Sequence, residues 1–320
     1  MSNILVTGAG GFVGGALAKR FLQDGHKVVG LFRDKSAEFK FEPITVGEPQ
    51  SVAVFADVTD RDALYRVLVD YDIEVVVHQA AHSIVKKCQE DPWSAYRTNI
   101  MGMVALLDAC RLRRMDYPPA IQAVVVATTD KVYGNGLVPY VETQSLRALG
   151  PYSASKVAAD IIARDYFTTY GLPVRVVRSS NIYGPGDLDE SRVIPGTIQR
   201  LLRGEPAVIY EQAWAMEREF VYIDDEVEAY KTIIEKGENG EAYNVGGSGP
   251  VPIMGVLRPL VTMLAGTVDD QTLKSKDRVL VEIRRQYMNA IKLQVLGWHQ
   301  EVSLEEGLRR TVEWWKARQG

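Results

Sequence analysis

Two side chains that could move a proton stand four residues apart in the chain. The stretch Gly150-Pro151-Tyr152-Ser153-Ala154-Ser155-Lys156 has a proline near its start, and proline is favoured in the first turn of a helix. Residues four apart share one face of a helix, so we expect the Lys156 ammonium beside the Tyr152 phenol. A nearby cation favours the phenolate, which could then take the proton of a hydroxyl group.

A valine-rich stretch that ends in hydroxyl and charged side chains comes earlier in the chain. Residues 124–126 predict a buried strand, and Thr128, Thr129, Asp130 and Lys131 follow it. Asp130 and Lys131 would supply two further titratable groups beside the tyrosine. The alternative interpretation of this pair is a structural ion pair at the end of a strand.

Glycines near the N-terminus indicate a site for a dinucleotide. The segment Thr7-Gly8-Ala9-Gly10-Gly11-Phe12-Val13-Gly14 follows an apolar run and precedes a helix-compatible stretch over 16–22. Glycines at 8, 11 and 14 would allow a tight turn, a close approach of the backbone to a pyrophosphate and close packing of the helix. The helix N-terminus would add N–H donors and positive potential.

The end of the second predicted strand bears on the choice of cofactor. An acidic residue there would bind the ribose hydroxyls of NAD, but this chain has Phe32 followed by Arg33. Arg33 could bind the 2′-phosphate of NADP by a charge-assisted contact, so we expect NADP in preference to NAD. In the alternative, Arg33 is solvated and Asp34 binds the ribose.

The elements that must position these groups follow from the length and pattern of the chain. It has 320 residues, more than a single core usually accommodates, so we expect two lobes with a cleft between them. Valine- and isoleucine-rich runs alternate with helical patterns and predict a doubly wound parallel α/β sheet with a smaller C-terminal substrate lobe. The predicted strands lie at residues 4–6, 28–31, 52–54, 75–77, 124–126 and 174–177. We assign 1–178 to a dinucleotide-binding domain, with roughly 220–248 returning to it, and 179–219 and 249–320 to the substrate domain.

Composition excludes several classes of protein. The net charge is −4 without a basic block, which argues against a nucleic-acid partner. No apolar run approaches the roughly 20 residues that span a membrane, and the chain starts without a secretory pattern, so we expect a cytoplasmic enzyme. Cys88 and Cys110 lack the spacing of metal ligands and are expected to be buried thiols in helices.

Taken together, the motifs resemble those of the extended short-chain dehydrogenase/reductase family of nucleotide-sugar epimerases and dehydratases. The resemblance extends over essentially the whole chain and includes the glycine turn, the Tyr152 and Lys156 pair, 96–102, 180–186, 218–225 and 296–298. It implies an extended Rossmann fold, NADP or NAD as cofactor and a nucleotide-diphosphate sugar as substrate. It also implies a homodimer formed through helices near 96–112 and 152–170.

The resemblance assigns roles residue by residue. Thr129, Tyr152 and Lys156 match the hydroxyl, tyrosine and lysine of the catalytic triad, with Thr128 as a neighbouring hydroxyl for the cofactor. The predicted cofactor contacts are Gly8, Gly11, Phe12, Val13, Gly14, Arg33, Asp57, Val58, Ala80, Ala81, Thr128, Tyr152 and Lys156. The predicted substrate contacts are His82, Asn99, Asn181, Arg192, Val193, Arg218 and Arg278. No metal site is expected, and neither His78 nor His82 is assigned to catalysis.

The reaction depends on Asp130 and Lys131. A 4-epimerase needs little beyond the triad, whereas a 4,6-dehydratase also needs a base at C5 and an acid at the C6 hydroxyl. Asp-Lys at these positions resembles CDP-glucose 4,6-dehydratase and the inverting UDP-N-acetylglucosamine dehydratases, and the 186–209 and 282–287 segments resemble CDP-glucose and GDP-mannose dehydratases. We therefore expect a 4,6-dehydratase.

Two alternatives remain. The 218–221 segment is closer to the phosphate-binding arginine motif of epimerases, which keeps open a 4-epimerase of the UDP-hexose or UDP-hexuronate type. A non-catalytic sensor that only binds the cofactor would have no need for Thr129, Tyr152 and Lys156 together.

Overall fold

A seven-stranded parallel sheet forms the larger part of the protein. The computed structural model describes residues 1–33, 50–118, 121–247, 249–276 and 283–318. The strand order is β11-β6-β5-β4-β1-β2-β3, and every pairing is parallel. The strands are β1 (Asn3–Thr7), β2 (Lys27–Phe32), β3 (Ser51–Phe55), β4 (Val75–His78), β5 (Ala123–Thr129), β6 (Val174–Ser179) and β11 (Ala242–Val245). From β1 the next strands β2 and β3 are added toward one edge of the sheet, whereas β4, β5 and β6 are added toward the other edge. The predicted doubly wound sheet is therefore confirmed.

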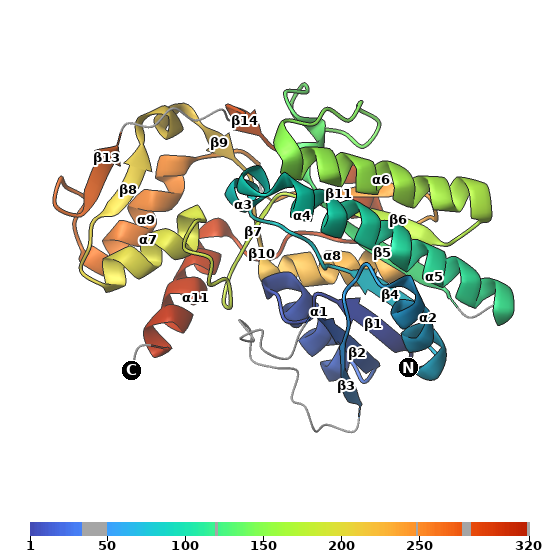
Figure 1. Cartoon of the computed structure of the whole chain (residues 1–320). Coiled ribbons are helices and arrows are strands. Elements are labelled where there is room, and N and C mark those ends of the chain that lie inside the picture. Colours follow the sequence, from blue (N-terminus) through green and yellow to red (C-terminus); the bar gives the residue numbers. More distant parts are fainter. Residues whose placement is uncertain (34–49, 119–120, 248, 277–282, 319–320) are drawn as a thin grey trace.

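Helices cover both faces of this sheet, which explains why its strands are apolar on both sides (Figure 1). One buried cluster joins it to α1 (Phe12–Gln23) and α8 (Ile223–Lys236). A second joins it to α2 (Arg61–Asp70), α5 (Gly102–Asp116) and α6 (Gly150–Tyr170). Burying one valine, leucine or isoleucine side chain stabilises the folded state by about 1.5–3 kcal/mol relative to leaving that side chain exposed. The six predicted strands are confirmed, each extended by one or more residues.

The later part of the chain builds a smaller body beside the sheet, where Figure 1 groups α7, α9 and α11. A third buried cluster packs α7 (Val193–Leu202), α9 (Ile253–Ala265) and α11 (Leu304–Ala317) together. Its short strands are β7 (Asn181–Tyr183), β8 (Ala207–Tyr210), β9 (Glu217–Arg218), β10 (Phe220–Tyr222), β12 (Val251–Pro252), β13 (Leu273–Lys276) and β14 (Arg285–Gln286). After β10 the chain returns through α8 to β11 at the edge of the large sheet. The predicted domain boundaries stay a prediction.

Short helices complete the fold. They are α3 (Val85–Glu90), α4 (Pro92–Tyr96), the π-helix η1 (Arg97–Met101), the 3-10 helices η2 (Asp130–Tyr133) and η3 (Glu211–Ala215), and α10 (Ile291–Val295). Cys88 in α3 and Cys110 in α5 are buried free thiols, as the sequence predicted. Among the described residues, every helix is too short or too polar to cross a lipid bilayer.

Candidate active site

The glycine turn joins β1 to α1 and leaves no room for side chains. Gly8 has a left-handed backbone with φ of 69°, and a β-carbon there would lie 2.8 Å from the amide nitrogen of Ala80. A β-carbon at Gly14 would lie 2.3 Å from the carbonyl oxygen of Gly8. Gly11 is the N-cap of α1 and has no side chain to bond the first helical N–H groups. The turn thus fits the diphosphate of a dinucleotide, which would occupy the space beside these N–H groups.

Phe12 and Val13 belong to the glycine turn, but their side chains pack elsewhere. Their side chains pack toward the cluster that holds the smaller body together, and the Arg192 guanidinium lies 6.0 Å from the Phe12 ring centroid. A contact of these two residues with a diphosphate would therefore come from their backbone N–H groups at the start of α1. The same turn connects the cofactor half of the molecule to the smaller body.

Charged side chains gather where the adenosine part of a dinucleotide would lie. Asp57 accepts hydrogen bonds from the amide (2.9 Å) and the hydroxyl (2.8 Å) of Thr59, and Arg97 lies 3.7 Å from it. The bond from the Thr59 amide is the main cause that lowers the pKa of Asp57, and the charges of Arg97 and Arg33 add to it. Arg33 follows β2 directly and is exposed, whereas Asp34 lies outside the described residues. Two arginines therefore stand near this carboxylate.

Val58, Ala80 and Ala81, three more of the predicted cofactor contacts, follow the ends of β3 and β4. Val58 is buried, and its side chain would lie 2.7 Å from a β-carbon at Gly102. The amide of Ala80 donates a hydrogen bond to the hydroxyl of Thr7 at 3.1 Å. The loop after β4 is therefore fastened to the end of β1, next to the glycine turn.

The proposed triad residues meet at the carboxyl end of β5. Thr129 ends the strand, and Tyr152 lies in the first turn of α6. Burial raises the pKa of the Tyr152 phenol, and the Thr129 hydroxyl opposes that rise. Lys156 is buried, and its ammonium donates a 2.9 Å hydrogen bond to the carbonyl of Ala127. The geometry thus brings all three predicted side chains to one strand end, with the lysine directed to the backbone.

Burial dominates the electrostatics of these residues. It raises the pKa of Tyr152 above its ordinary value, the charge of Asp130 adds to the rise, and the Thr129 hydroxyl opposes it. Burial lowers the pKa of Lys156 to about 8. The phenol is therefore neutral near pH 7, and a positive charge must approach it before it can act as a base. The oxidised nicotinamide ring of NAD carries such a charge.

Asp130 is a buried carboxyl group beside the triad. It begins η2 and is 1% exposed. Its Oδ1 accepts a hydrogen bond from the Thr129 hydroxyl at 3.0 Å and lies 3.6 Å from the ammonium of Lys131. Its buried Oδ2 has no hydrogen-bond partner among the described residues. A carboxyl group left half satisfied in this way is costly for folding and is suited to exchange a proton with a substrate.

Thr128 and His78 have partners within the protein. The Thr128 hydroxyl donates to the carbonyl of Val177 at 3.0 Å, so its predicted contact with the cofactor stays a prediction. The ring of His78 is hydrogen-bonded to the Thr7 hydroxyl at 2.8 Å. Burial, with a smaller effect of Lys156, lowers the pKa of His78 to about 3, which keeps its imidazole neutral.

Asn99 and His82, both predicted to contact the substrate, bind each other. The backbone amide of His82 donates to Asn99 Oδ1 at 2.7 Å, and Asn99 Nδ2 donates to the His82 carbonyl at 3.0 Å. The same nitrogen donates to the Ser155 hydroxyl at 2.9 Å. Asn99 is 2% exposed, so its side chain holds the loop after β4 against α6, and a substrate contact stays a prediction. Ser155 was not singled out by the sequence, although it lies inside the tyrosine motif.

Arginines reach the site from the smaller body. Arg192 precedes Val193 at the start of α7, forms an ion pair with Asp187 at 2.8 Å, and lowers the pKa of Tyr152 through its charge. Arg218 on β9 is 7% exposed and donates hydrogen bonds to the carbonyls of Glu217 and Arg284. Arg192 therefore stands close to the triad.

Asn181 and Arg278 were also predicted to contact the substrate. Asn181 on β7 donates its amide to the carbonyl of Glu219 at 2.9 Å. Arg278 lies outside the described residues.

A further buried carboxyl group, Glu219, was part of a recognised motif without an assigned role. Its position directly after Arg218 was the only signal in the sequence.

These observations define a class of protein. A doubly wound sheet with a dinucleotide turn, and a Thr-Tyr-Lys group at the end of β5, are the parts of a dinucleotide-dependent enzyme that acts on a hydroxyl group. The model of the NAD dependent epimerase/dehydratase family matches residues 4–246. The chain belongs to this family.

Named relatives support the family over the whole chain. A dTDP-glucose 4,6-dehydratase of Xanthomonas campestris pv. campestris is 31% identical, with 100% of this chain and 94% of the relative covered. A trifunctional UDP-glucose 4,6-dehydratase/UDP-4-keto-6-deoxy-D-glucose 3,5-epimerase/UDP-4-keto-L-rhamnose-reductase of Arabidopsis thaliana is 30% identical over 98% of this chain. The chain spans only 47% of that relative.

Solved structures agree with the fold. A dTDP-glucose 4,6-dehydratase from Streptomyces venezuelae, solved with NAD, has a TM-score of 0.89 and 28% identity, covering 99% of this chain and 98% of that one. A UDP-glucose 4-epimerase from Thermotoga maritima, solved with UDP-glucose, has a TM-score of 0.89 and 26% identity, covering 99% and 100%.

The relatives correct one expectation. Short motifs indicated CDP-glucose and GDP-mannose dehydratases, whereas the curated relatives named here are dTDP-glucose and UDP-glucose enzymes. The assignment to the family stands, and the narrower resemblance to CDP-glucose and GDP-mannose dehydratases is not supported. The physical reason is that the motifs were read from a few short loops, which differ between enzymes that share a fold and a triad.

Proposed function

We propose that this protein is a nucleotide-sugar 4,6-dehydratase, which forms an NDP-4-keto-6-deoxy-sugar. The observation that carries the proposal is the half-satisfied, buried carboxyl group of Asp130, hydrogen-bonded to the triad threonine. An epimerase has no step that needs this acid, whereas elimination of water does. The dehydratases among the relatives support the same reaction.

Each residue then has a task. NAD, when bound, would supply a hydride acceptor for C4 and then a hydride donor for C6, while the proton taken from C5 returns to C5. Tyr152, assisted by the Thr129 hydroxyl, takes the proton of the C4 hydroxyl. Lys131, or a water that it holds, takes the C5 proton, which the neighbouring ketone makes acidic, and Asp130 gives a proton to the C6 hydroxyl so that it leaves as water.

The remaining predicted contacts belong to this proposal. Gly8, Gly11 and Gly14 receive the cofactor diphosphate, and Lys156 contacts the cofactor. Arg218 binds the diphosphate of the sugar nucleotide by bidentate hydrogen bonds and Asn181 by its amide, with Arg192 and Arg278 as further candidates. The predicted domains would separate these two tasks, one for the cofactor and one for the sugar nucleotide.

A 4-epimerase is the second candidate. It is favoured by the sequence from Arg218 to Val221 and by the structural likeness to the Thermotoga maritima epimerase. In that reaction, Asp130 and Lys131 would form only the ion pair between their side chains, whose atoms are 3.6 Å apart.

A panel of substrates separates the two reactions. The purified protein is incubated with dTDP-, UDP-, CDP- and GDP-hexoses, and the products are analysed by mass spectrometry. Loss of one water from any of them supports the dehydratase. Unchanged mass with an inverted C4, and no water loss from any hexose, would replace the dehydratase with the epimerase.

We also propose that NADP is preferred over NAD, although the structural relatives were solved with NAD. Support comes from Arg33, which is exposed at the end of β2 and follows Phe32 where an acidic residue would exclude a 2′-phosphate. Arg33→Ala should weaken NADP by about tenfold and NAD little, measured by titration calorimetry. Equal losses of affinity for NADP and NAD would contradict the proposed preference for NADP.

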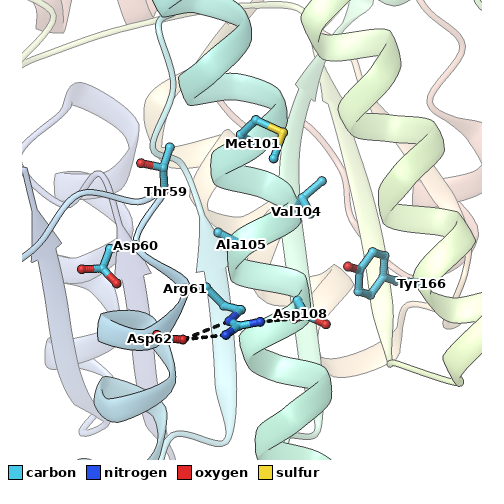
Figure 2. Close-up of a pocket in the computed structure, with 9 residues that line it drawn as sticks. All are labelled: Thr59, Asp60, Arg61, Asp62, Met101, Val104, Ala105, Asp108 and Tyr166. Carbon is cyan, nitrogen blue, oxygen red and sulfur yellow. Dashed lines mark hydrogen bonds and ion pairs between the residues drawn. The ribbon is translucent and has the colours of Figure 1, made fainter.

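We further propose a homodimer through the face made by α5 and α6. Trp93, Met101, Ile161 and Tyr170 are each at least half exposed on or near this face, so this face offers apolar side chains to a partner. A hollow of about 610 Å³ is lined by side chains that include Met101, Val104 and Tyr166, and Figure 2 shows where these side chains lie. The hollow contains none of the proposed catalytic residues, and a second copy of the chain would fill it. Light scattering of the protein and of Ile161→Glu tests this, because a dimer in the wild type should become a monomer in the variant.

A further inference from the structure

Glu219 is a buried acidic residue to which the proposed function gives no task. It stands between β9 and β10 and is 1% exposed, which is rare for a carboxyl group. Two neighbours, Arg218 along the chain and Asn181 on β7, are proposed to bind the diphosphate of the sugar nucleotide. The contacts of Glu219 show how these two residues are held.

The backbone of Glu219 holds Asn181. Its carbonyl oxygen accepts a hydrogen bond from the backbone amide of Asn181 at 3.1 Å and another from Asn181 Nδ2 at 2.9 Å. The next residue, Phe220, then pairs with Asn181 in the parallel strands β10 and β7. Because a side-chain amide nitrogen carries two hydrogens, one bond to Glu219 orients the Asn181 side chain and the second hydrogen can bond a ligand.

The side chain of Glu219 holds a second segment, the chain that continues from β14. This strand pairs in parallel with β9 and places Gln286 opposite Arg218. The chain leaves β9 at Glu219, whose carbonyl accepts from Asn181, so the carboxyl group supplies the next acceptor. Its Oε2 accepts the hydrogen bond of the Met288 amide at 3.0 Å. One side chain thus extends the pairing of β9 and β14 by one bond.

The segment that Glu219 holds makes contacts at both of its ends. Before β14, the carbonyl of Arg284 accepts a hydrogen bond from Arg218 Nη1 at 3.3 Å. After Met288, the amide of Asn289 donates to the carbonyl of Tyr140 at 2.8 Å. The bond to Met288 lies between these two contacts, so its loss would loosen the backbone that supports the Arg218 guanidinium.

The space around the carboxyl group is shaped for it. A β-carbon at Gly246 would lie 2.7 Å from Oε2, so the glycine makes room for the carboxyl group. The Oε1 atom has no hydrogen-bond partner among the described residues. A buried polar group that is only partly satisfied costs free energy of folding, so a role in the site explains Glu219 better than a role in stability.

We propose that Glu219 is a positioning residue that holds Asn181 and Arg218 in the geometry that binds the diphosphate of the sugar nucleotide. Its carbonyl orients Asn181. Its carboxyl group fixes, through Met288, the segment whose carbonyl accepts from Arg218. The inference rests on the proposed binding of a sugar nucleotide, and it holds for dehydration and epimerisation alike.

Glu219→Ala and Glu219→Gln test the role of the carboxyl group. Alanine removes the acceptor for Met288, whereas glutamine keeps an acceptor oxygen and nearly the same size. Burial raises the pKa of Glu219 to about 8, so glutamine also resembles the protonated group present near pH 7. We expect the Michaelis constant for the sugar nucleotide to rise by about tenfold in Glu219→Ala, the size of one lost hydrogen bond. In Glu219→Gln it should stay near the wild-type value.

Two further measurements separate positioning from catalysis. The kcat of Glu219→Ala should change little, because the lost contact serves binding and not the chemical step. Titration calorimetry with UDP, dTDP, CDP and GDP reports on the diphosphate site without turnover, and affinity should fall by the same factor as the Michaelis constant rises. Affinity for the cofactor should remain at the wild-type value.

Glu226→Ala is the matched control for a loss of stability. Glu226 is also fully buried, and its carboxyl group accepts a hydrogen bond from the Ser179 hydroxyl. Both alanine variants should lower the free energy of unfolding, but only Glu219→Ala should raise the Michaelis constant. An equal rise in Glu226→Ala, an unchanged constant in Glu219→Ala, or a glutamine variant as impaired as the alanine variant would overturn the proposal.

The remaining outcomes also decide. If Glu219→Ala does not fold, Glu219→Asp replaces it, because the shorter side chain withdraws the acceptor from Met288. Weaker nucleotide binding in Glu219→Asp than in Glu219→Gln then supports the proposal, and equal binding overturns it. If the wild type binds none of the four nucleoside diphosphates, the proposed function fails and the inference fails with it. Wild-type binding that no Glu219 variant alters overturns the inference alone.

Discussion

Two buried polar clusters each include a residue of η2, and they are built on opposite principles. In the first, Arg178 forms two hydrogen bonds with Asp160, at 2.8 and 2.9 Å, and one with the hydroxyl of Tyr133 at 2.8 Å. The Tyr133 hydroxyl in turn donates to Asn244 at 2.6 Å. In the second, Asp130 and Glu219 each keep a buried oxygen without a partner among the described residues.

The difference between the two clusters distinguishes a charged group that stabilises the fold from one that can react with a ligand. A buried ion pair whose hydrogen bonds are all made holds β6 against α6 and has nothing left to offer a ligand. A half-satisfied carboxyl group costs free energy of folding and gains a partner only when a substrate or a proton arrives. The first cluster should therefore govern stability, and the second should govern reaction rate.

The largest expected effect is on turnover, in Tyr152→Phe. Loss of the phenol removes the base that starts the reaction, so the rate should fall by about 10 000-fold, at the upper end for proton-transfer groups. Cofactor affinity, measured by calorimetry, and the free energy of unfolding, measured with urea, should remain near the wild-type values. Normal turnover in this variant would remove Tyr152 from the catalytic group.

Next in size is the loss of stability in Asp160→Ala. This change leaves the Arg178 guanidinium buried without its carboxylate, which should cost about 3–5 kcal/mol. Urea unfolding measures the loss, and Asp62→Ala, which breaks an exposed ion pair with Arg61, should have a much smaller effect. A stability equal to that of the wild type would erase the distinction between the two clusters.

A smaller effect, confined to one step, is expected in Asp130→Asn. Asparagine keeps the size of the side chain but lacks the acid, so water release should slow by about 100-fold while oxidation at C4 persists. A 4-keto sugar that still has its C6 hydroxyl should accumulate and be visible by mass. As a companion, Lys131→Met should stop exchange of the C5 proton with deuterated solvent. Near-normal inversion of a sugar carbon in both variants would favour the epimerase.

The smallest effect concerns the dependence of stability on pH. Burial raises the pKa of Glu226 from 4.5 to about 8, so between these values the folded protein keeps a proton that the unfolded chain has lost. Stability therefore falls as the pH rises through this window. Glu226→Gln should make the slope less steep by about 1.4 kcal/mol per pH unit, the value for one group. Urea unfolding at several pH values measures it, and an unchanged slope would show that Glu226 is ionised in the folded state.

Much of the fold was predictable because its signals are local. The valine-rich runs gave the six strands, since strands buried on both faces need apolar side chains at every position. The glycine turn was equally local, because the left-handed backbone of Gly8 and the contact of Gly14 with the Gly8 carbonyl arise within one turn. Tyr152 and Lys156 were found because their spacing along a helix is itself the signal.

The site was only partly predictable, because several of its contacts join distant segments. The side chain of Asn99 binds the backbone of His82 and the hydroxyl of Ser155, contacts that the sequence did not indicate, and its contact with substrate stays a prediction. Lys156 was expected beside the phenol, and its ammonium donates to the Ala127 carbonyl. A hydrogen-bond partner depends on the last ångström of approach, which residue spacing does not specify.

The sequence by itself determined the doubly wound sheet, the dinucleotide turn and the identity of the residues at the end of β5, because periodicity and short motifs encode local backbone structure. Only the tertiary structure decided that the charge of Asp130 affects the pKa of Glu219 and that the charge of Arg192 affects the pKa of Tyr152. The physical reason is that burial and Coulomb energy depend on distances in space between segments far apart in the chain. No spacing along the sequence carries that information.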